Sequence, residues 1–317
     1  MKQIGCFLRQ ITAMMVAIIS VSLIASAETI TNVRGRQRAG SNLVDIYYDL
    51  DAPEGGTYTV EVEIEGRTNE VTAATFTGSV GGGVRPGRNH HIVWDAGIDW
   101  PDKKGDVKAV VTTTKENHKG VQLWAGGPYW ATTNIGASHP WESGLYFWWG
   151  DTIGYRPLSG TFSFDFSSGN SAIYTYGKSV SELQSTGWVT RDGILAPEHD
   201  AAQVQWGEGW RMPTDQELDD LNRKCKWDWM KTNGVEGYVV RGRDNFAANS
   251  IFLPAAGYGY GTSLSYAGLY GRYWSSILDV EDYCHSLHLR FNSLSHGRYS
   301  HDRSDGRSVR PVQGDTN

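Results

Sequence analysis

Cysteine is scarce in this chain of 317 residues, which contains only Cys6, Cys225 and Cys284. Disulfide scaffolds and cysteine metal sites require a characteristic spacing, and these three scattered residues provide none. Basic clusters are also rare, since lysine and arginine are dispersed outside residues 34–38 and the net charge is -6. The composition therefore argues against nucleic acid or an anionic membrane as a partner, and we expect no cofactor and no bound metal.

Long hydrophobic runs are missing after the N-terminal segment. Residues 1–27 carry Lys2 and Arg9, continue with the apolar residues 14–19 and end in Ala-Ser-Ala, a small-residue pattern that a signal peptidase cleaves. An uncleaved membrane anchor is the alternative, but the apolar run is shorter than the ~20 residues that a span requires. We therefore expect a signal peptide over residues 1–27 and a mature protein that is secreted or lies at the cell surface, without membrane insertion.

Export would place Cys225 and Cys284 in a compartment where disulfides persist. The two residues either pair with each other or remain as two independent buried thiols. The sequence leaves both alternatives open.

Residues 28–115 are rich in strand and turn signals. Apolar and polar residues alternate with a period of two, most clearly in residues 58–64 and 107–111, while residues 81–83 are three glycines typical of a turn. No helical period is found, so we expect a small all-β antiparallel sandwich with strands at residues 43–48, 58–64, 91–94 and 107–111. Residues 89–97, Asn-His-His-Ile-Val-Trp-Asp-Ala-Gly, resemble the immunoglobulin-like or fibronectin-like modules that precede bacterial surface domains of the formylglycine-generating-enzyme type.

A polar connection, residues 116–120, is expected to link this sandwich to a second domain over residues 121–317. Glycine and aromatic residues alternate there, which favours short strands and tight loops around a core of rings. Two short helices are predicted, one over residues 197–204 and one beginning at Thr214, where Thr-Asp-Gln-Glu forms a capping box with Glu217. The apolar face of the second helix would consist of Leu218, Leu221 and Cys225.

Several motifs in the second domain are specific in their order. They are Trp-Ala-Thr-Thr-Asn-Ile-Gly-Ala at residues 130–137, Phe-Trp-Trp-Gly at 147–150, Asp-Ala-Ala at 200–202, Trp-Gly-Glu-Gly-Trp-Arg-Met-Pro-Thr-Asp-Gln-Glu-Leu at 206–218, Ile-Phe-Leu-Pro-Ala-Ala-Gly-Tyr at 251–258, Tyr-Trp-Ser-Ser at 273–276 and Ser-Val-Arg-Pro-Val at 308–312. With these motifs, residues 121–317 resemble the Fibrobacter succinogenes major paralogous domain.

The resemblance implies an α+β, C-type-lectin-like fold that is distantly related to the formylglycine-generating-enzyme fold. Such a domain would have two short helices, small antiparallel sheets and long loops that form a ligand face. Trp210, Trp274 and Arg310 lie in the motifs that define the family, so we expect them to belong to the structural frame rather than to contact a ligand.

Residues 277–312 have an unusual composition, with no Lys, Gln, Met or Trp and a single Glu, Glu281. Diversity-generating retroelements retarget C-type-lectin-like proteins by mutating adenines, and altered Asn codons yield Ser, Asp, His, Tyr or Arg but none of those five residue types. This predicts a diversified ligand-binding region over residues 276–306, with Asn292 as an unaltered remnant. The alternative is that a short exposed segment simply avoids those residues.

Within this region Leu287, Leu289 and Phe291 alternate with polar residues, so one strand face is apolar and the other is a candidate binding surface. The expected ligand is an unknown protein or glycan. The predicted ligand contacts are Asp279, Asp282, Tyr283, His285, His288, Arg290, His296, Arg298, Tyr299, His301 and Arg303.

Enzyme activity is the less favoured function. An oxidase of the formylglycine-generating type would need a nearby pair of reactive cysteines or a His/His/Glu metal site, and the sequence contains neither pattern. The Glu-Pro-Asn and Gln-Pro-Asp triplets of calcium-dependent sugar sites are also missing. We therefore expect a binding protein, with a purely structural surface protein without a specific ligand as the alternative.

Overall fold

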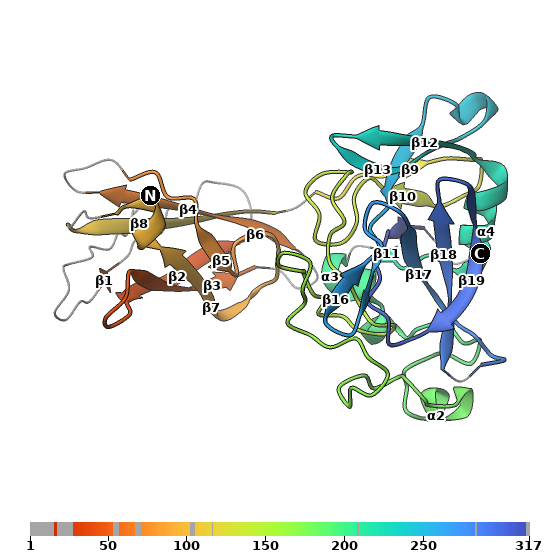
Figure 1. Ribbon diagram of the computed structural model, residues 1–317, viewed down its shortest axis with the longest axis horizontal. Coiled ribbons are helices and arrows are strands. Elements are labelled where there is room, and N and C mark those ends of the chain that lie inside the picture. The colour runs from red at the N-terminus through yellow and green to blue at the C-terminus, as the bar shows by residue number, and fades with distance from the viewer. Residues whose placement is uncertain are drawn as a thin grey trace. The chain divides into compact units, whose positions relative to one another are not determined.

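The chain forms two compact units, Met1–Asn117 (unit 1) and His118–Asn317 (unit 2), in the computed structural model (Figure 1). The structure describes residues 16–17, 28–52, 57–66, 71–101, 105–115, 117–207, 209–282 and 284–314. Gly120, which the sequence placed in the polar connection, is already the first residue of a strand of unit 2. Among the described residues, no helix is both long enough and apolar enough to cross a membrane.

Unit 1 consists of two antiparallel sheets, with strand orders β1-β2-β3-β7-β5 and β6-β4-β8. The strands are β1 (Val16–Ala17), β2 (Thr29–Gln37), β3 (Leu43–Asp51), β4 (Tyr58–Gly66), β5 (Phe76–Gly78), β6 (Gly81–Val84), β7 (Gly87–Asp95) and β8 (Val107–Lys115). Strand β1 lies inside the segment predicted to be a signal peptide, most of which is outside the described residues.

Both sheets of unit 1 contribute to one hydrophobic core. Ile46 and Trp94 of the first sheet and Val60 and Val111 of the second belong to the same buried cluster, as period-two alternation requires. The four expected strands are confirmed. Two local expectations were wrong: the glycines of residues 81–83 extend a strand, because Gly81 and Val84 pair with β4, and one helical turn, α1 (Ala96–Asp99), follows β7.

The helices of unit 2 begin at side-chain caps. The described ones are α2 (Val180–Ser185), α3 (Ala201–Trp206) and α4 (Asp215–Lys224), with short 3-10 turns η1 (Pro197–His199) and η2 (Asp244–Phe246). The Thr214 and Glu217 capping box of α4 is confirmed, and Glu217 also receives two hydrogen bonds from the Arg211 guanidinium at 2.7 and 2.8 Å. Helix α2 makes a third short α-helix where two were expected, and it is one and a half turns that bury a single residue, Leu183.

The strands of unit 2 form small antiparallel sheets. Their orders are β11-β20-β10-β9, β12-β13-β14, β15-β16 and β17-β18-β19. The bounds are β9 (Gly120–Gln122), β10 (Tyr129–Ala131), β11 (Trp210–Arg211), β12 (Lys226–Thr232), β13 (Val235–Arg241), β14 (Ser250–Pro254), β15 (Tyr258–Tyr260), β16 (Ser263–Ser265), β17 (Gly271–Leu278), β18 (His285–Asn292), β19 (Ser295–Asp302) and β20 (Val312–Gln313).

The expected frame residues of unit 2 are buried, which confirms that part of the prediction: Trp210, Trp274 and Arg310 expose 3%, 1% and 1% of their surface. The Arg310 guanidinium donates to Asn134 Oδ1 at 2.8 Å and to two backbone carbonyl oxygens at 2.9 and 3.1 Å. Trp274 Nε1 donates to the carbonyl of Phe147 at 2.8 Å. These bonds hold the segments that carry the motifs together without leaving the buried donors unpaired.

Candidate functional site

The predicted ligand contacts are distributed over the two opposite faces of the β17-β18-β19 sheet. Figure 1 shows the three strands side by side, and α4 packs on them. The face that carries Tyr273, Leu289 and Phe291 belongs to the hydrophobic core behind the sheet. The opposite face, called here the site face, carries Arg272, Trp274, Ser286, His288, Arg290, Tyr299 and His301, because residues paired across neighbouring strands point the same way. The alternation read from the sequence therefore separates the faces correctly.

His296 and Arg298 point away from the site face and hold α4. The His296 ring stacks on Trp227 with centroids 4.4 Å apart, and its Nδ1 contacts Asn222. Arg298 forms ion pairs with Asp215 and Asp219, the second at 3.1 Å. Their polar groups are engaged by the helix or by the residues around it, and ligand contact by these two residues stays a prediction.

Asp279, Asp282 and His285 lie at the end of the sheet, in and beside the loop between β17 and β18. Asp279 accepts from the Glu281 amide at 3.0 Å, and His285 lies between two carboxylates, with nitrogens 3.2 Å from Asp282 and 3.2 Å from Asp302. The structure thus brings these three predicted contacts close to one another at the end of the sheet. Tyr283, the remaining predicted contact in this loop, lies outside the described residues.

His288 and Arg303 are buried, with exposed fractions of 1% and 0%. The Arg303 guanidinium lies 5.8 Å from the centroid of the Trp149 ring and donates to the carbonyl of Lys178 at 2.9 Å. His288 lies under Tyr299, with ring centroids 6.2 Å apart. The prediction that they contact a ligand directly is therefore corrected. The alternation marked the polar face of β18 but gave no information about what covers it.

A surface of tyrosine and arginine side chains forms where the site face meets the segment before it in sequence. We call Tyr258, Tyr266, Tyr270, Arg290 and Tyr299 the tyrosine–arginine surface. The guanidinium of Arg272 lies 3.7 Å from the centroid of the Tyr258 ring, and that of Arg290 lies 5.0 Å from Tyr270 and 5.2 Å from Tyr299. Tyr266 and Tyr299 are exposed, and Arg290 is half-buried. Planar groups thus alternate across the surface at cation–π distances.

Backbone pairing positions the tyrosines. Gly259 exchanges two hydrogen bonds with Gly306, at 2.7 and 2.9 Å, which fixes the β15-β16 hairpin beside the C-terminal segment. A Cβ atom at either glycine would lie 2.6 Å from the ring of Phe166, so neither position has room for a side chain. Two segments far apart in the sequence therefore meet at this point.

Beneath the surface lies a buried charged cluster, which we call the arginine cluster: Arg272, Arg307, His288 and Asp305. Asp305 Oδ2 receives a hydrogen bond from Arg307 Nη2 at 2.9 Å and lies 3.4 Å from Arg272 Nη1. His301 Nδ1 is 3.3 Å from the same oxygen. The Arg307 guanidinium lies 4.0 Å from the centroid of the Trp274 ring, so the cluster rests on a frame residue.

In the arginine cluster, burial and the interactions between charged groups shift the pKa values of the side chains in opposite directions. Burial raises the pKa of Asp305, but hydrogen bonds from His301 and Arg307 outweigh it and hold that pKa below its ordinary value. Burial lowers the pKa of Arg307 to about 10 and also lowers the pKa of Arg272. Arg307 therefore stays charged at neutral pH, inside a region where charges interact strongly.

The His288 ring should make stability depend on pH. Burial lowers its pKa well below the ordinary 6.5, and the nearby charges of Arg307, Arg272, His301 and Arg290 lower it further. Below pH 6.5 the unfolded chain binds a proton that the folded chain does not, so stability falls as the pH drops from 7 to 5, by up to about 1.4 kcal/mol per pH unit for this group. Urea unfolding at pH 5, 6 and 7 measures the slope.

The His288→Leu variant isolates this contribution. Burial also lowers the pKa of His90, His199 and His296, so the slope of the native chain contains their contributions as well. We expect the pH dependence of stability in the variant to lack the contribution of the His288 proton and to keep the contributions of the other histidines. An unchanged slope in the variant would mean that folded His288 takes up its proton at an ordinary pH.

Tyr299 was predicted as a ligand contact, whereas Tyr258, Tyr266 and Tyr270 were not, because they lie before residues 277–312, whose composition defined the candidate region. Residues 257–271 contain four tyrosines among glycine and serine. This is the composition that binding loops use, because tyrosine provides large rigid contact area and glycine and serine provide adaptable backbone and hydrogen bonds. The signal is therefore present in the sequence, directly before residues 277–312.

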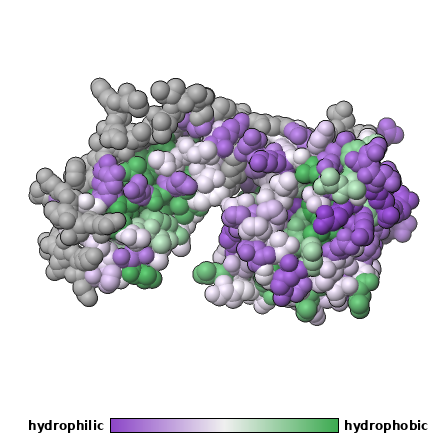
Figure 2. Space-filling model, turned by 90° about the horizontal axis from the view of Figure 1, so that it is seen from above, coloured by the Kyte–Doolittle hydropathy of each residue, from purple (hydrophilic) through white to green (hydrophobic). Residues whose placement is uncertain are grey.

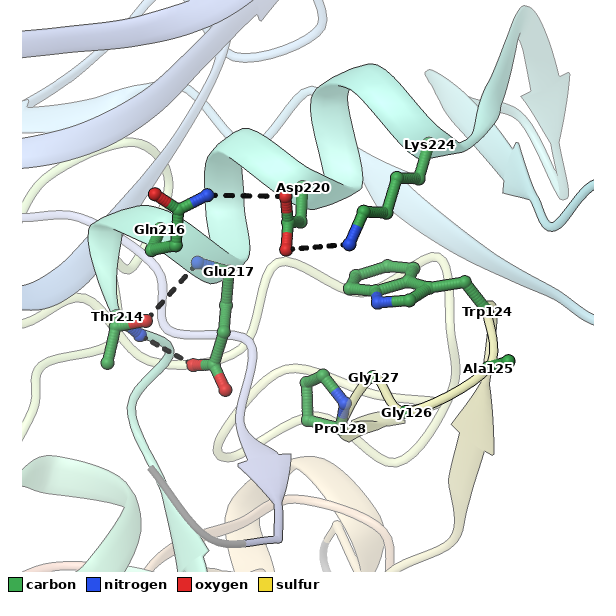
Figure 3. Close-up of a pocket in the computed structure, with 10 residues that line it drawn as sticks. All are labelled: Trp124, Ala125, Gly126, Gly127, Pro128, Thr214, Gln216, Glu217, Asp220 and Lys224. Atoms are coloured by element: carbon green, nitrogen blue, oxygen red, sulfur yellow. Dashed lines mark hydrogen bonds and ion pairs between the residues drawn. The ribbon is translucent and has the colours of Figure 1, made fainter. Parts of the chain in front are cut away.

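A separate small pocket lies between α4 and the turn after β9 (Figure 3). Its volume is about 90 Å³, and the Trp124 ring forms one wall. Its charged groups are already paired: Asp220 accepts from Lys224 at 3.0 Å and from Gln216 at 3.2 Å, and Glu217 belongs to the capping box. The lining residues therefore stabilise α4, and the pocket offers few unpaired groups to a ligand.

The function of the site is inferred from its geometry, because neither the cysteines nor the comparisons with known proteins identify it. Cys225 and Cys284 are both free, and burial raises the pKa of Cys225 to about 12. Within the part of the chain that the structure describes, no group of three or more His, Cys, Asp or Glu side chains is arranged to hold a metal ion. Comparison with protein families, curated proteins and solved structures finds no match to this chain.

Proposed function

We propose that unit 2 is a ligand-binding module and that the chain acts as a secreted or cell-surface binding protein. The observation that carries the proposal is the tyrosine–arginine surface. Its rings are rigid and amphipathic, and its guanidinium groups offer planar donors. Tyr258, Arg290 and Tyr299 lie on paired strands, and Tyr266 and Tyr270 lie in the segment between β16 and β17. Figure 2 shows hydrophilic residues over much of the visible face of unit 2, with smaller hydrophobic areas between them.

The fold proposed for unit 2 is C-type-lectin-like, of the Fibrobacter succinogenes major paralogous domain, with an immunoglobulin-like or fibronectin-like unit 1. The ordered motifs support it, as do the short helices, the small antiparallel sheets and the buried positions of Trp210, Trp274 and Arg310. Fold alone does not assign a ligand, so the function depends on the surface.

Diversification by a retroelement is part of the proposal. The residue usage of 277–312 supports it, and its exposed Tyr299 and half-buried Arg290 and His301 lie at the tyrosine–arginine surface or beside it. Sequencing the genomic neighbourhood tests it: we expect an Asn-rich near-copy of the segment beside a reverse transcriptase gene. If clones of one strain show no variation confined to adenine positions, and no such copy exists, the surface is fixed.

Two other functions are ranked below binding. A structural surface protein would need no ligand surface, and exposed stacked tyrosines such as Tyr266 favour binding over that role. An oxidase of the formylglycine-generating type would need a reactive thiolate, whereas the Cys225 thiol with its raised pKa is protonated at neutral pH.

Replacing Tyr299 with Ser should abolish retention of ligand. The full chain is immobilised, and retention is measured on a glycan array and in pull-downs from the native microbial community. We expect at least a tenfold loss for Tyr299→Ser, because a rigid exposed ring beside Arg290 is removed. The matched control is Tyr129→Ser, on β10, since Tyr129 is 48% exposed and Tyr299 is 44% exposed. Equal retention by both variants, or no retained ligand at all, would favour the structural role.

A further inference from the structure

Positive charge exceeds negative charge around the arginine cluster. Arg272, Arg290 and Arg307 contribute three guanidinium groups, and Asp305 is the carboxylate bonded to the cluster among the described residues. No ion pair of Arg290 is found in that part of the chain, and the phenol of Tyr270 is its hydrogen-bond partner. A region with this excess of buried cations favours a negatively charged group nearby.

Several buried donors and acceptors of the cluster have no hydrogen-bond partner. They are Nε of Arg272, Nε and Nη1 of Arg307, both ring nitrogens of His288 and Oδ1 of Asp305. An unpaired buried polar group costs about 1 to 3 kcal/mol, and more if it is charged, so native proteins pair nearly all of them with protein, water or ions. Guanidinium donors of this kind are suited to an oxyanion, whose oxygens accept charge-assisted hydrogen bonds.

Half-buried Arg290 lies beside this cluster, between the rings of Tyr270 and Tyr299. Arg272 lies directly beside it, since the two residues are paired across β17 and β18. A ligand that reaches Arg290 thus enters the field of two deeper guanidinium groups, in surroundings where burial weakens the screening by water. The tyrosine rings offer flat apolar faces, which match the C–H face of a sugar ring.

We infer that the tyrosine–arginine surface takes an acidic sugar, a uronate or a sulfated glycan, whose oxyanion binds at Arg290 over the arginine cluster while its ring packs on the tyrosines. The inference rests on the proposed function and names its ligand class. It assigns Arg290 as a binding residue and Arg272 and Arg307 as positioning residues that supply the electrostatic field.

The test uses the full chain, glucuronate and inorganic sulfate as anionic probes, and glucose as the neutral probe, at matched ionic strength. Calorimetry should detect glucuronate binding that weakens as salt is added, and little or no binding of glucose. Arg290→Gln should weaken glucuronate binding at least tenfold. The matched control is Arg241→Gln, on β13, whose side chain is 41% exposed and lies 3.7 Å from Asp228; its binding should equal that of the native chain.

The glycan array separates this inference from the proposed function. Retention of acidic glycans that both Tyr299→Ser and Arg290→Gln abolish supports both. Retention of neutral glycans that only Tyr299→Ser abolishes keeps the binding function and overturns the acidic-sugar inference. If glucuronate binding depends on Arg290 but no glycan or protein is retained, the anion site is supported and the proposed function is overturned. Binding of acidic peptides but not of uronates or sulfate overturns the sugar class.

Discussion

Replacing Asp305 with Asn should lower the free energy of unfolding by about 3 to 5 kcal/mol, because a buried cluster loses its counter-charge. Asp305 is 1% exposed and bonds to Arg307, which is fully buried, while Arg272 lies at 3.4 Å. An Asn side chain fills the same space but cannot balance either guanidinium group. Urea unfolding at pH 7 in low salt, without sulfate or phosphate, measures the loss.

Two controls make the Asp305 result specific. Asp228→Asn removes an exposed carboxylate that pairs with Lys226 at 3.2 Å, and it should cost less than about 1 kcal/mol. The double variant Asp305→Leu with Arg307→Met should recover part of the loss, since an apolar pair in place of a buried ion pair is often neutral or stabilising. If Asp305→Asn unfolds within about 1 kcal/mol of the native chain, the cluster is balanced by another group.

Local sequence patterns predicted the strands and the helix start that depend on residues close together in the sequence. Period-two alternation located β4 and β8, because half-buried strands must alternate. The capping box located the start of α4, because Thr214 and Glu217 satisfy backbone donors that the helix leaves unpaired. Strands β5 and β6 were not predicted, since the first is short and the second consists mainly of glycine.

The candidate site could be predicted only in part, because it is assembled by contacts between distant segments. Alternation placed Arg290 and Tyr299 on usable strand positions, but the pairing of Gly259 with Gly306 that brings the tyrosines beside them has no local signal. His288 looked equally available in the sequence. It is buried because other side chains of the site cover it, and period-two alternation says which face a residue occupies, not whether that face is open.

Helix α4 provides the partners of two other predicted contacts. His296 and Arg298 alternate with Tyr299 along β19, so they face Asn222, Asp215 and Asp219 rather than the site face. The polar character of these residues suggested ligand binding, yet it serves the packing of an acidic helix on a strand. A charged residue on a strand can therefore be recognised as a ligand contact only when its tertiary partner is known.

Replacing Trp274 with Ala should cost about 3 to 5 kcal/mol, because the ring is buried in the middle of unit 2 and the void cannot close completely. Its indole nitrogen donates to the carbonyl of Phe147 at 2.8 Å, and the Arg307 guanidinium rests on its face at 4.0 Å. The substitution thus removes packing, one hydrogen bond and the support of the arginine cluster. Thermal and urea unfolding measure the loss.

Variants of graded size separate these contributions. Trp274→Phe keeps an aromatic ring but removes the indole hydrogen bond to the Phe147 carbonyl, which still accepts from the Arg307 amide at 2.9 Å, and we expect a smaller loss of about 1 to 2 kcal/mol. The half-exposed Trp141, which stacks on His139 at 4.7 Å, is the matched control, and Trp141→Ala should cost well under 1 kcal/mol, roughly the effect of a surface substitution. A Trp274→Ala chain that kept its melting temperature and lost only ligand retention would contradict the frame role, and Trp274 would then be a ligand contact.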